Sequence, residues 1–199
     1  MRRIRYLQLD VFTSAPFGGN QLAVFFDASN LTSEEMQAIA REMNFSESVF
    51  VLPATDPRAL ARLRIFTPHI ELPFAGHPVV GATFALAESG AIRADTESPV
   101  TLEVGVGPLT IDLLFGERRL SFAWMSQPIP TFQAWAGDRA ALAAALNLAP
   151  GDLRADLPIE RGSAGVPFVF IPIASEEALD RAQSGAGLGA ALNDAVGHT

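Results

Sequence analysis

A carboxylate, an imidazole and the start of a helix are the features of this sequence that could do chemistry. Glu47 stands in the segment NFSESVFVLP. Extended pairing from Phe45 onward would put Glu47 in one row with Val49, because strand side chains alternate with a period of two. A carboxylate in an apolar row could take up and return a proton. The structural alternative is a strand-end carboxylate that turns to solvent or pairs with an arginine.

The segment ELPFAGHPVVGATFALAESG, from Glu71 to Gly90, predicts a helix without a polar face. Pro78 suits the first helical position and Gly90 suits the end. A helix that is apolar on every side belongs in the interior. Its N-terminus, with unpaired N–H groups and a partial positive charge, is then a potential anion site beside Gly76 and His77. His77 could donate to a substrate, cap the helix, or do both.

Residue types exclude several other chemistries. The sequence has no cysteine, and its 14 basic residues are all arginine. This chain therefore offers no thiol nucleophile, no cysteine-ligated zinc and no lysine for a Schiff base. His69, Glu71 and His77 do not match the H-E-x-x-H spacing of a helical zinc site. We expect neither a metal nor a cofactor.

Composition bounds the class of protein. The chain has 199 residues, 49% of them hydrophobic, and a formal net charge of −8. That content is enough for a core, and no basic stripe is present, so nucleic acid and membrane surfaces are poor partners. No apolar run approaches the roughly 20 residues that a bilayer requires, and MRRIRYLQLDVF lacks the apolar region of a signal peptide. We expect a cytoplasmic protein.

Strand and helix patterns are mixed along the chain, which indicates an α+β fold. Thr32 and Glu35 form a capping-box pattern at the start of an amphipathic helix, and Asp138 and Ser175 suit the caps of two later helices. Trp124 and Trp135 are expected in the core. The chain is expected to divide near residue 117, into residues 1–117 and 118–199. Predicted strands are 4–13, 22–26, 48–52, 61–68, 100–115, 118–125 and 166–173, and predicted helices are 31–44, 78–90, 139–148 and one from 175.

Three motifs together resemble one family. DVFTSAPFGGNQLAVFFDA, MQAIAREMNFSESVF and RIFTPHIELPFAGHPVVGA closely resemble, in this order, the N-terminal half of the phenazine-biosynthesis PhzF-like isomerases. The resemblance implies a fold like that of diaminopimelate epimerase, in which each of two similar domains wraps a barrel-like sheet around a central helix. Residues 1–117 would then form the N-terminal barrel domain, and residues 118–199 part of the second.

The resemblance also implies a site between two domains. Glu47, in the Asn-x-Ser-Glu motif, would be the catalytic acid/base, and Gly76 and His77 would contact the substrate, with Ser46 a further candidate. The implied activity is a cofactor-independent isomerisation that moves a proton between carbons of a small anionic, cyclic or unsaturated acid.

Two alternatives stay open, because a Glu-Asp-Pro-x-Thr-Gly-Ser segment typical of the family's second domain is absent from this sequence. The chain could be a catalytically inactive or truncated binding protein, or another chain could supply the missing part. A half-built barrel exposes strand edges and apolar surface, so we expect a homodimer.

Overall fold

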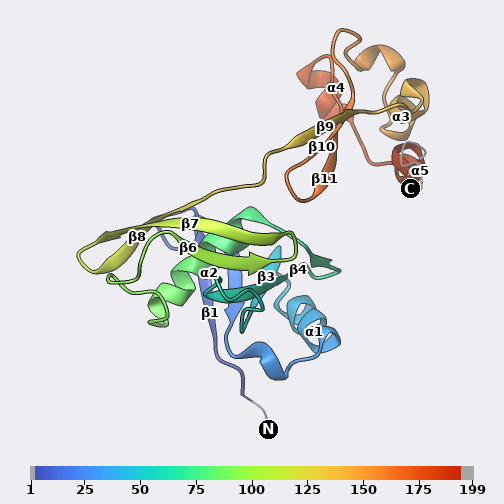
Figure 1. Cartoon of the computed structure of the whole chain (residues 1–199). Coiled ribbons are helices and arrows are strands. Elements are labelled where there is room, and N and C mark those ends of the chain that lie inside the picture. Colours follow the sequence, from blue (N-terminus) through green and yellow to red (C-terminus); the bar gives the residue numbers. More distant parts are fainter. Residues whose placement is uncertain (1–2, 194–199) are drawn as a thin grey trace. The chain divides into compact units, whose positions relative to one another are not determined.

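The computed structural model describes residues 3–193, which form two compact units (Figure 1). The first unit extends to Pro128 and the second begins at Ile129. The boundary expected near residue 117 falls instead in the turn between two paired strands, β7 (Gly107–Gly116) and β8 (Arg119–Met125). The first unit continues past that point because β8 is held in its sheet. That residues 118–199 form part of a second domain similar to the first stays a prediction.

The first unit is a strongly curled sheet with one helix inside it. The strand order is β1-β2-β3-β4-β6-β7-β8, and β5 pairs with β4. The helix α2 contacts β1, β2, β3 and β8, which include both ends of that order. The remaining elements of this unit are β1 (Tyr6–Val11), β2 (Asn20–Phe25), α1 (Ser33–Met43), β3 (Glu47–Leu52), β4 (Ala61–Phe66), β5 (Glu71–Leu72), α2 (Gly76–Glu88) and β6 (Val100–Val104).

The helix α2 is the centre of the first core, as its apolar sequence predicted. Its Val79, Ala82 and Ala85 are fully buried, and they pack in one cluster with residues of β2, β3, β4, β6 and β7. The helix begins at Gly76, so Pro78 occupies its third position and not the first, where it still costs no intrahelical hydrogen bond. Gly90 has φ of 83° just beyond the helix end, as predicted.

The other face of β2 and β3 packs against α1. Phe25 and Phe50 stack with their ring centroids 4.9 Å apart, and Met36 of α1 is fully buried in the same cluster. The predicted capping box is present, because the Glu35 amide donates to the Thr32 hydroxyl and the Thr32 amide donates to the Glu35 carboxylate. Strands β2 and β3 are therefore covered on both faces, which fixes the position of every residue along them.

The second unit is a three-stranded antiparallel sheet with short helices. The sheet order is β11-β10-β9, and Leu142 and Trp135 lie in the core of the unit. Asp138 and Ser175 cap their helices as predicted. The elements are β9 (Thr131–Ala134), α3 (Arg139–Ala145), β10 (Glu160–Ser163), β11 (Pro167–Phe170), α4 (Glu176–Arg181) and α5 (Leu188–Asn193).

The expectation that both tryptophans are in the core is wrong for one of them. Trp135 is 8% exposed, whereas Trp124 on β8 is 65% exposed. The reason is the alternation along β8: Ala123 faces α2 and is buried, so its neighbour Trp124 points to the outside of the sheet.

Candidate functional site

Glu47 is the first residue of β3, and a tight turn brings it there. The helix α1 ends at Met43, and the left-handed conformation of the next residue, Asn44 (φ 54°), turns the chain. The row that starts at Glu47 continues through Val49, which packs in the α2 cluster. Phe45 was expected in this row, but it precedes the strand and packs in the α1 cluster. The expected row of apolar residues therefore exists on the C-terminal side of Glu47 alone.

Parallel pairing of β2 with β3 places a second polar residue at the same end of the sheet. Leu22 is in register with Glu47, so Asn20, two residues earlier on β2, lies on the same face just beyond it. Gly19, just before β2, packs closely against the end of β1, since a β-carbon there would clash with the carbonyl oxygen of Val11. Two rows that face α2 thus begin with polar residues, Asn20 on β2 and Glu47 on β3.

The N-terminus of α2 meets these two residues. His77 Nε2 lies 3.5 Å from Glu47 Oε2, and the two side chains are 9% and 18% exposed. No side chain caps this helix end. The backbone N–H groups of its first turn, with their partial positive charge, therefore add to the polar character of the site.

Asn20 links the imidazole to Ser46. The Ser46 hydroxyl donates to Asn20 Oδ1 at 3.0 Å, and Asn20 Nδ2 lies 3.2 Å from His77 Nδ1. Asn20 and Ser46 are exposed, whereas His77 and Glu47 are largely buried. The four side chains form a continuous polar path from the surface to the Glu47 carboxylate.

The facing atoms of Glu47 and His77 are buried without a hydrogen bond. Among the described residues, neither Glu47 Oε2 nor His77 Nε2 has a hydrogen-bonding partner. Each buried unsatisfied polar atom costs about 1–3 kcal/mol, and such groups in a native protein call for an explanation other than stability. Burial lowers the pKa of His77 from its ordinary value of 6.5, and the nearby Glu47 carboxylate opposes part of that shift.

Gly76 has no structural need for glycine. Gly76 does not have a positive φ, the conformation that favours glycine. A β-carbon added to it would lie 3.9 Å from the Met125 methyl carbon and would clash with nothing. The missing side chain leaves the backbone at the start of α2 open to approach. This favours a role for Gly76 in contact with a ligand.

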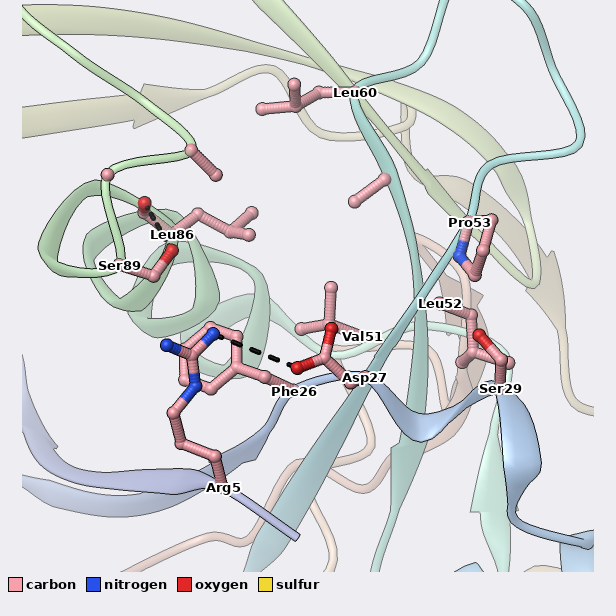
Figure 2. Close-up of a pocket in the computed structure, with 13 residues that line it drawn as sticks. Arg5, Phe26, Asp27, Ser29, Val51, Leu52, Pro53, Leu60, Leu86 and Ser89 are labelled. Carbon is pink, nitrogen blue, oxygen red and sulfur yellow. Dashed lines mark hydrogen bonds and ion pairs between the residues drawn. The ribbon is translucent and has the colours of Figure 1, made fainter.

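A separate cavity of about 490 Å³ opens at the other end of α2 (Figure 2). The guanidinium of Arg5 lies over the ring of Phe26 at 4.9 Å and 3.9 Å from a carboxylate oxygen of Asp27. Neither Glu47 nor His77 lines this cavity. Its charged side chains, Arg5 and Asp27, are exposed and paired with each other.

The structure brings together all four residues that the sequence identified. Ser46, Glu47, Gly76 and His77 meet at one end of the sheet, although they come from two segments about 30 residues apart. Sequence reasoning missed Asn20, which falls between the predicted strands 4–13 and 22–26. The sequence did contain one signal for Asn20, its position at the end of the family motif DVFTSAPFGGN.

Residues 3–193 contain neither a candidate metal site nor a candidate membrane span. No group of three or more histidine, aspartate and glutamate side chains there is arranged to hold a metal ion. Within the same part of the chain, none of the helices has the length and apolar character needed to cross a bilayer.

The fold is shared with proteins of known structure, among them a predicted epimerase, a PhzF-family protein and a probable racemase. A protein from Pseudomonas aeruginosa described as a predicted epimerase superimposes with a TM-score of 0.80 at 38% identity, over 98% of this chain and 68% of that one. A PhzF-family phenazine biosynthesis protein from Bacillus anthracis superimposes with a TM-score of 0.75 at 33% identity, over 98% of this chain and 64% of that one. A probable proline racemase from Agrobacterium radiobacter shares the fold at 15% identity, with a TM-score of 0.62. The diaminopimelate epimerase-like fold expected from the sequence is confirmed.

The sequence comparisons define the family. The model of the phenazine biosynthesis-like proteins matches residues 9–194, and the chain therefore belongs to the PhzF family. It is 42% identical over 177 residues to trans-2,3-dihydro-3-hydroxyanthranilate isomerase from Pseudomonas aeruginosa, covering 88% of this chain and 59% of that protein. It is 40% identical over 183 residues to an uncharacterised isomerase of Mesorhizobium japonicum, covering 91% of this chain and 60% of that protein. The chain thus spans about three fifths of these relatives.

The lowered pKa of His77 predicts a pH dependence of stability. The unfolded chain takes up a proton at this imidazole more readily than the folded chain, so stability is lost as the pH falls through 6.5 toward the folded-state value. Between about pH 7.5 and pH 5, the wild type should lose more stability than His77→Gln in urea unfolding. The exposed His69, changed to Gln, serves as the control and should behave as the wild type. Equal losses in the wild type and His77→Gln would contradict the assignment.

Proposed function

We propose that this chain carries the proton-transfer half of a cofactor-independent PhzF-type isomerase. The observation that supports the proposal is the buried pair of Glu47 Oε2 and His77 Nε2, which face each other at 3.5 Å without hydrogen-bonding partners. The pair lies at the N-terminus of the buried helix α2. Such a place suits a small anionic, cyclic or unsaturated acid, since the amides attract its negative charge.

Glu47 is the proposed acid/base. Its carboxylate takes a proton from one carbon of the substrate, and the electron pair of the broken C–H bond moves into the adjacent unsaturated system. The same carboxyl group returns the proton to a different carbon, where a new C–H bond forms. Nothing is oxidised or reduced, so the reaction needs no redox cofactor.

His77 and Gly76 are the proposed substrate contacts. Asn20 Nδ2 carries hydrogens and no lone pair, so Nδ1 of a neutral His77 accepts from it and Nε2 carries the ring proton. That proton points toward Glu47 and is available to a substrate carboxylate or carbonyl. Together with the backbone amides of Gly76 and His77, it would stabilise the negative charge that develops on the substrate. Ser46 acts through Asn20 by fixing the orientation of the amide.

A non-catalytic protein with the same fold is the second candidate. It is favoured by the absence from this sequence of the second-domain motif. In that case the same residues would bind a small acid without turnover. The cytoplasmic location stays a prediction under both proposals.

Replacing the proposed acid/base tests the function. With trans-2,3-dihydro-3-hydroxyanthranilate in D₂O, the wild-type chain should exchange a carbon-bound proton for deuterium, as seen by proton NMR. Loss of a general base costs about 10²–10⁴-fold, so Glu47→Gln should reduce exchange by about this factor with an unchanged circular dichroism spectrum.

Glu71→Gln is the matched control, because the Glu71 carboxylate pairs with Arg64 and does not contact Glu47 or His77. It should exchange at the wild-type rate. Wild-type exchange in Glu47→Gln would contradict the role of Glu47. Binding of the acid without exchange by the wild type would favour the non-catalytic protein.

We infer that two copies of the chain associate through the outer face of β7 and β8. Leu114 and Phe122 are paired across these strands, and Trp124 follows on the same face. They are 62%, 51% and 65% exposed, and the rings of Phe122 and Trp124 lie 6.3 Å apart. Adjacent exposed apolar side chains of this kind mark contact surfaces.

Light scattering coupled to size exclusion tests this association. The wild type should have twice the mass of one chain, and Trp124→Glu should shift it toward a single chain because a charge would be buried at the contact. Phe17→Glu, at a position 95% exposed in a loop, is the control and should leave the mass unchanged. A monomeric wild type at high concentration would rule out the homodimer.

A further inference from the structure

The cavity at the C-terminal end of α2 is built from separate parts of the first unit (Figure 2). Its lining residues are residue 5 and others within 26–29, 51–53, 60–61 and 86–91. The volume of about 490 Å³ falls in the range of small-molecule sites, about 300–1,000 Å³. None of the residues at the N-terminal end of α2 lines it, so a ligand held here is independent of the proposed isomerisation.

The floor of this cavity is apolar. Phe26, Ala61 and Leu86 line it and are 5%, 5% and 4% exposed. Leu60, also in the lining, is 43% exposed and offers further apolar surface. Removing such surface from water is favourable, so the floor suits an aliphatic group of a ligand.

A cation and an anion stand side by side above the floor. Figure 2 shows the side chains of Arg5 and Asp27 pointing toward one another, with the guanidinium held over the Phe26 ring. Their nearest atoms are 3.9 Å apart, whereas a charge-assisted hydrogen bond of this kind measures about 2.7–2.9 Å. The contact is therefore an ion pair without a hydrogen bond, and both groups keep their capacity to bond a ligand.

Asp27 is also free of the role that its position would give it. It immediately precedes the short helix η1 (Ala28–Asn30), where an aspartate commonly accepts from the first amides, but its side chain makes no such bond. Its backbone is left-handed, with φ of 53°. Within residues 3–193, Arg5 is the one ion-pair partner of this carboxylate, and no hydrogen bond is donated to it.

We propose that this cavity binds a free α-amino acid with an apolar side chain. The ammonium group donates to the Asp27 carboxylate, and the partial negative charge at the C-terminal end of α2 favours it there. The carboxylate of the ligand accepts from the Arg5 guanidinium. The apolar side chain covers Phe26 and Leu86.

The spacing of the protein charges favours an α-amino acid over other charged molecules. Both charged groups of an α-amino acid are attached to one carbon, which matches two protein charges 3.9 Å apart. The four charges then alternate in sign around a closed ring. A ligand with a single charge would compete with the contact between Arg5 and Asp27 instead of bridging it.

A series of ligands tests the proposal on the wild-type chain by NMR. L-leucine should shift the amide signals of Ser89 and Gly90, which line the cavity, with a dissociation constant of about 1 mM or below. Its isomer ε-aminocaproate, with the two charges at opposite ends, should bind at least about tenfold more weakly. The same loss is expected for the α-keto acid of leucine, for isopentylamine and for L-serine, which lack the ammonium, the carboxylate and the apolar side chain. Anthranilate is not a ligand of this class, because its aromatic amine is uncharged near neutral pH.

Two variants with matched controls make the test specific. Arg5→Gln and Asp27→Asn each remove one charge at an exposed position and should weaken leucine binding at least about tenfold. Asparagine also tolerates the left-handed backbone of residue 27. Arg154→Gln and Asp156→Asn alter an exposed Arg–Asp pair of the second unit that does not line the cavity, and binding should be unchanged. Circular dichroism verifies the fold of each variant, and the ligand series does not depend on any of them.

Three results would overturn the proposal. Leucine gives no saturable shift of Ser89 and Gly90 up to about 10 mM, tenfold above the expected dissociation constant. One of the four analogues binds as tightly as leucine. Either Arg5→Gln or Asp27→Asn binds leucine as tightly as the wild type. None of these results concerns Glu47 or turnover, so failure here and failure of the proposed isomerase are distinguishable.

Discussion

The burial of α2 is the constraint on which the first unit depends. A helix without a polar face is stable in water when other elements cover it. Strands β1 to β8 do this by curling, and the two-residue alternation of β2 and β3 then puts Leu22 and Val49 against the helix. Once the rows are fixed, so are their ends. The polar residues Asn20 and Glu47 begin these rows beside the N-terminus of α2, because β2 and β3 run in parallel register.

The same arrangement accounts for the electrostatics of the site. His77 at the start of a buried helix loses hydration, which lowers its pKa and so favours the neutral imidazole. A neutral ring can donate from one nitrogen and accept at the other, and the Ser46–Asn20 pair occupies the accepting side. In the proposed function, the nitrogen that faces Glu47 is the one that contacts the substrate.

Local sequence patterns were sufficient to predict the buried helix, one helix cap and most of the candidate site residues. The buried helix follows from VVGATFALA, the capping box from Thr32 and Glu35, and the meeting of Glu47 with His77 from a specific family resemblance. Asn20 could not be found in this way, because its contact depends on the parallel register of β2 with β3, a long-range pairing that no local pattern encodes. Trp124 was misplaced for a related reason: hydrophobicity predicts burial, but the phase of the strand decides which face a residue occupies.

The central claim is that small acids bind at the N-terminal end of α2, and NMR of labelled protein tests it most directly. Titration with anthranilate, an aromatic acid without the reactive hydrogen, should move the amide signals of Gly76 and His77 and the ring nitrogens of His77. The signals of Ser89 and Gly90, beside the cavity at the other end of the helix, should stay in place. Shifts centred on Ser89 and Gly90, with Gly76 and His77 unchanged, would contradict the account.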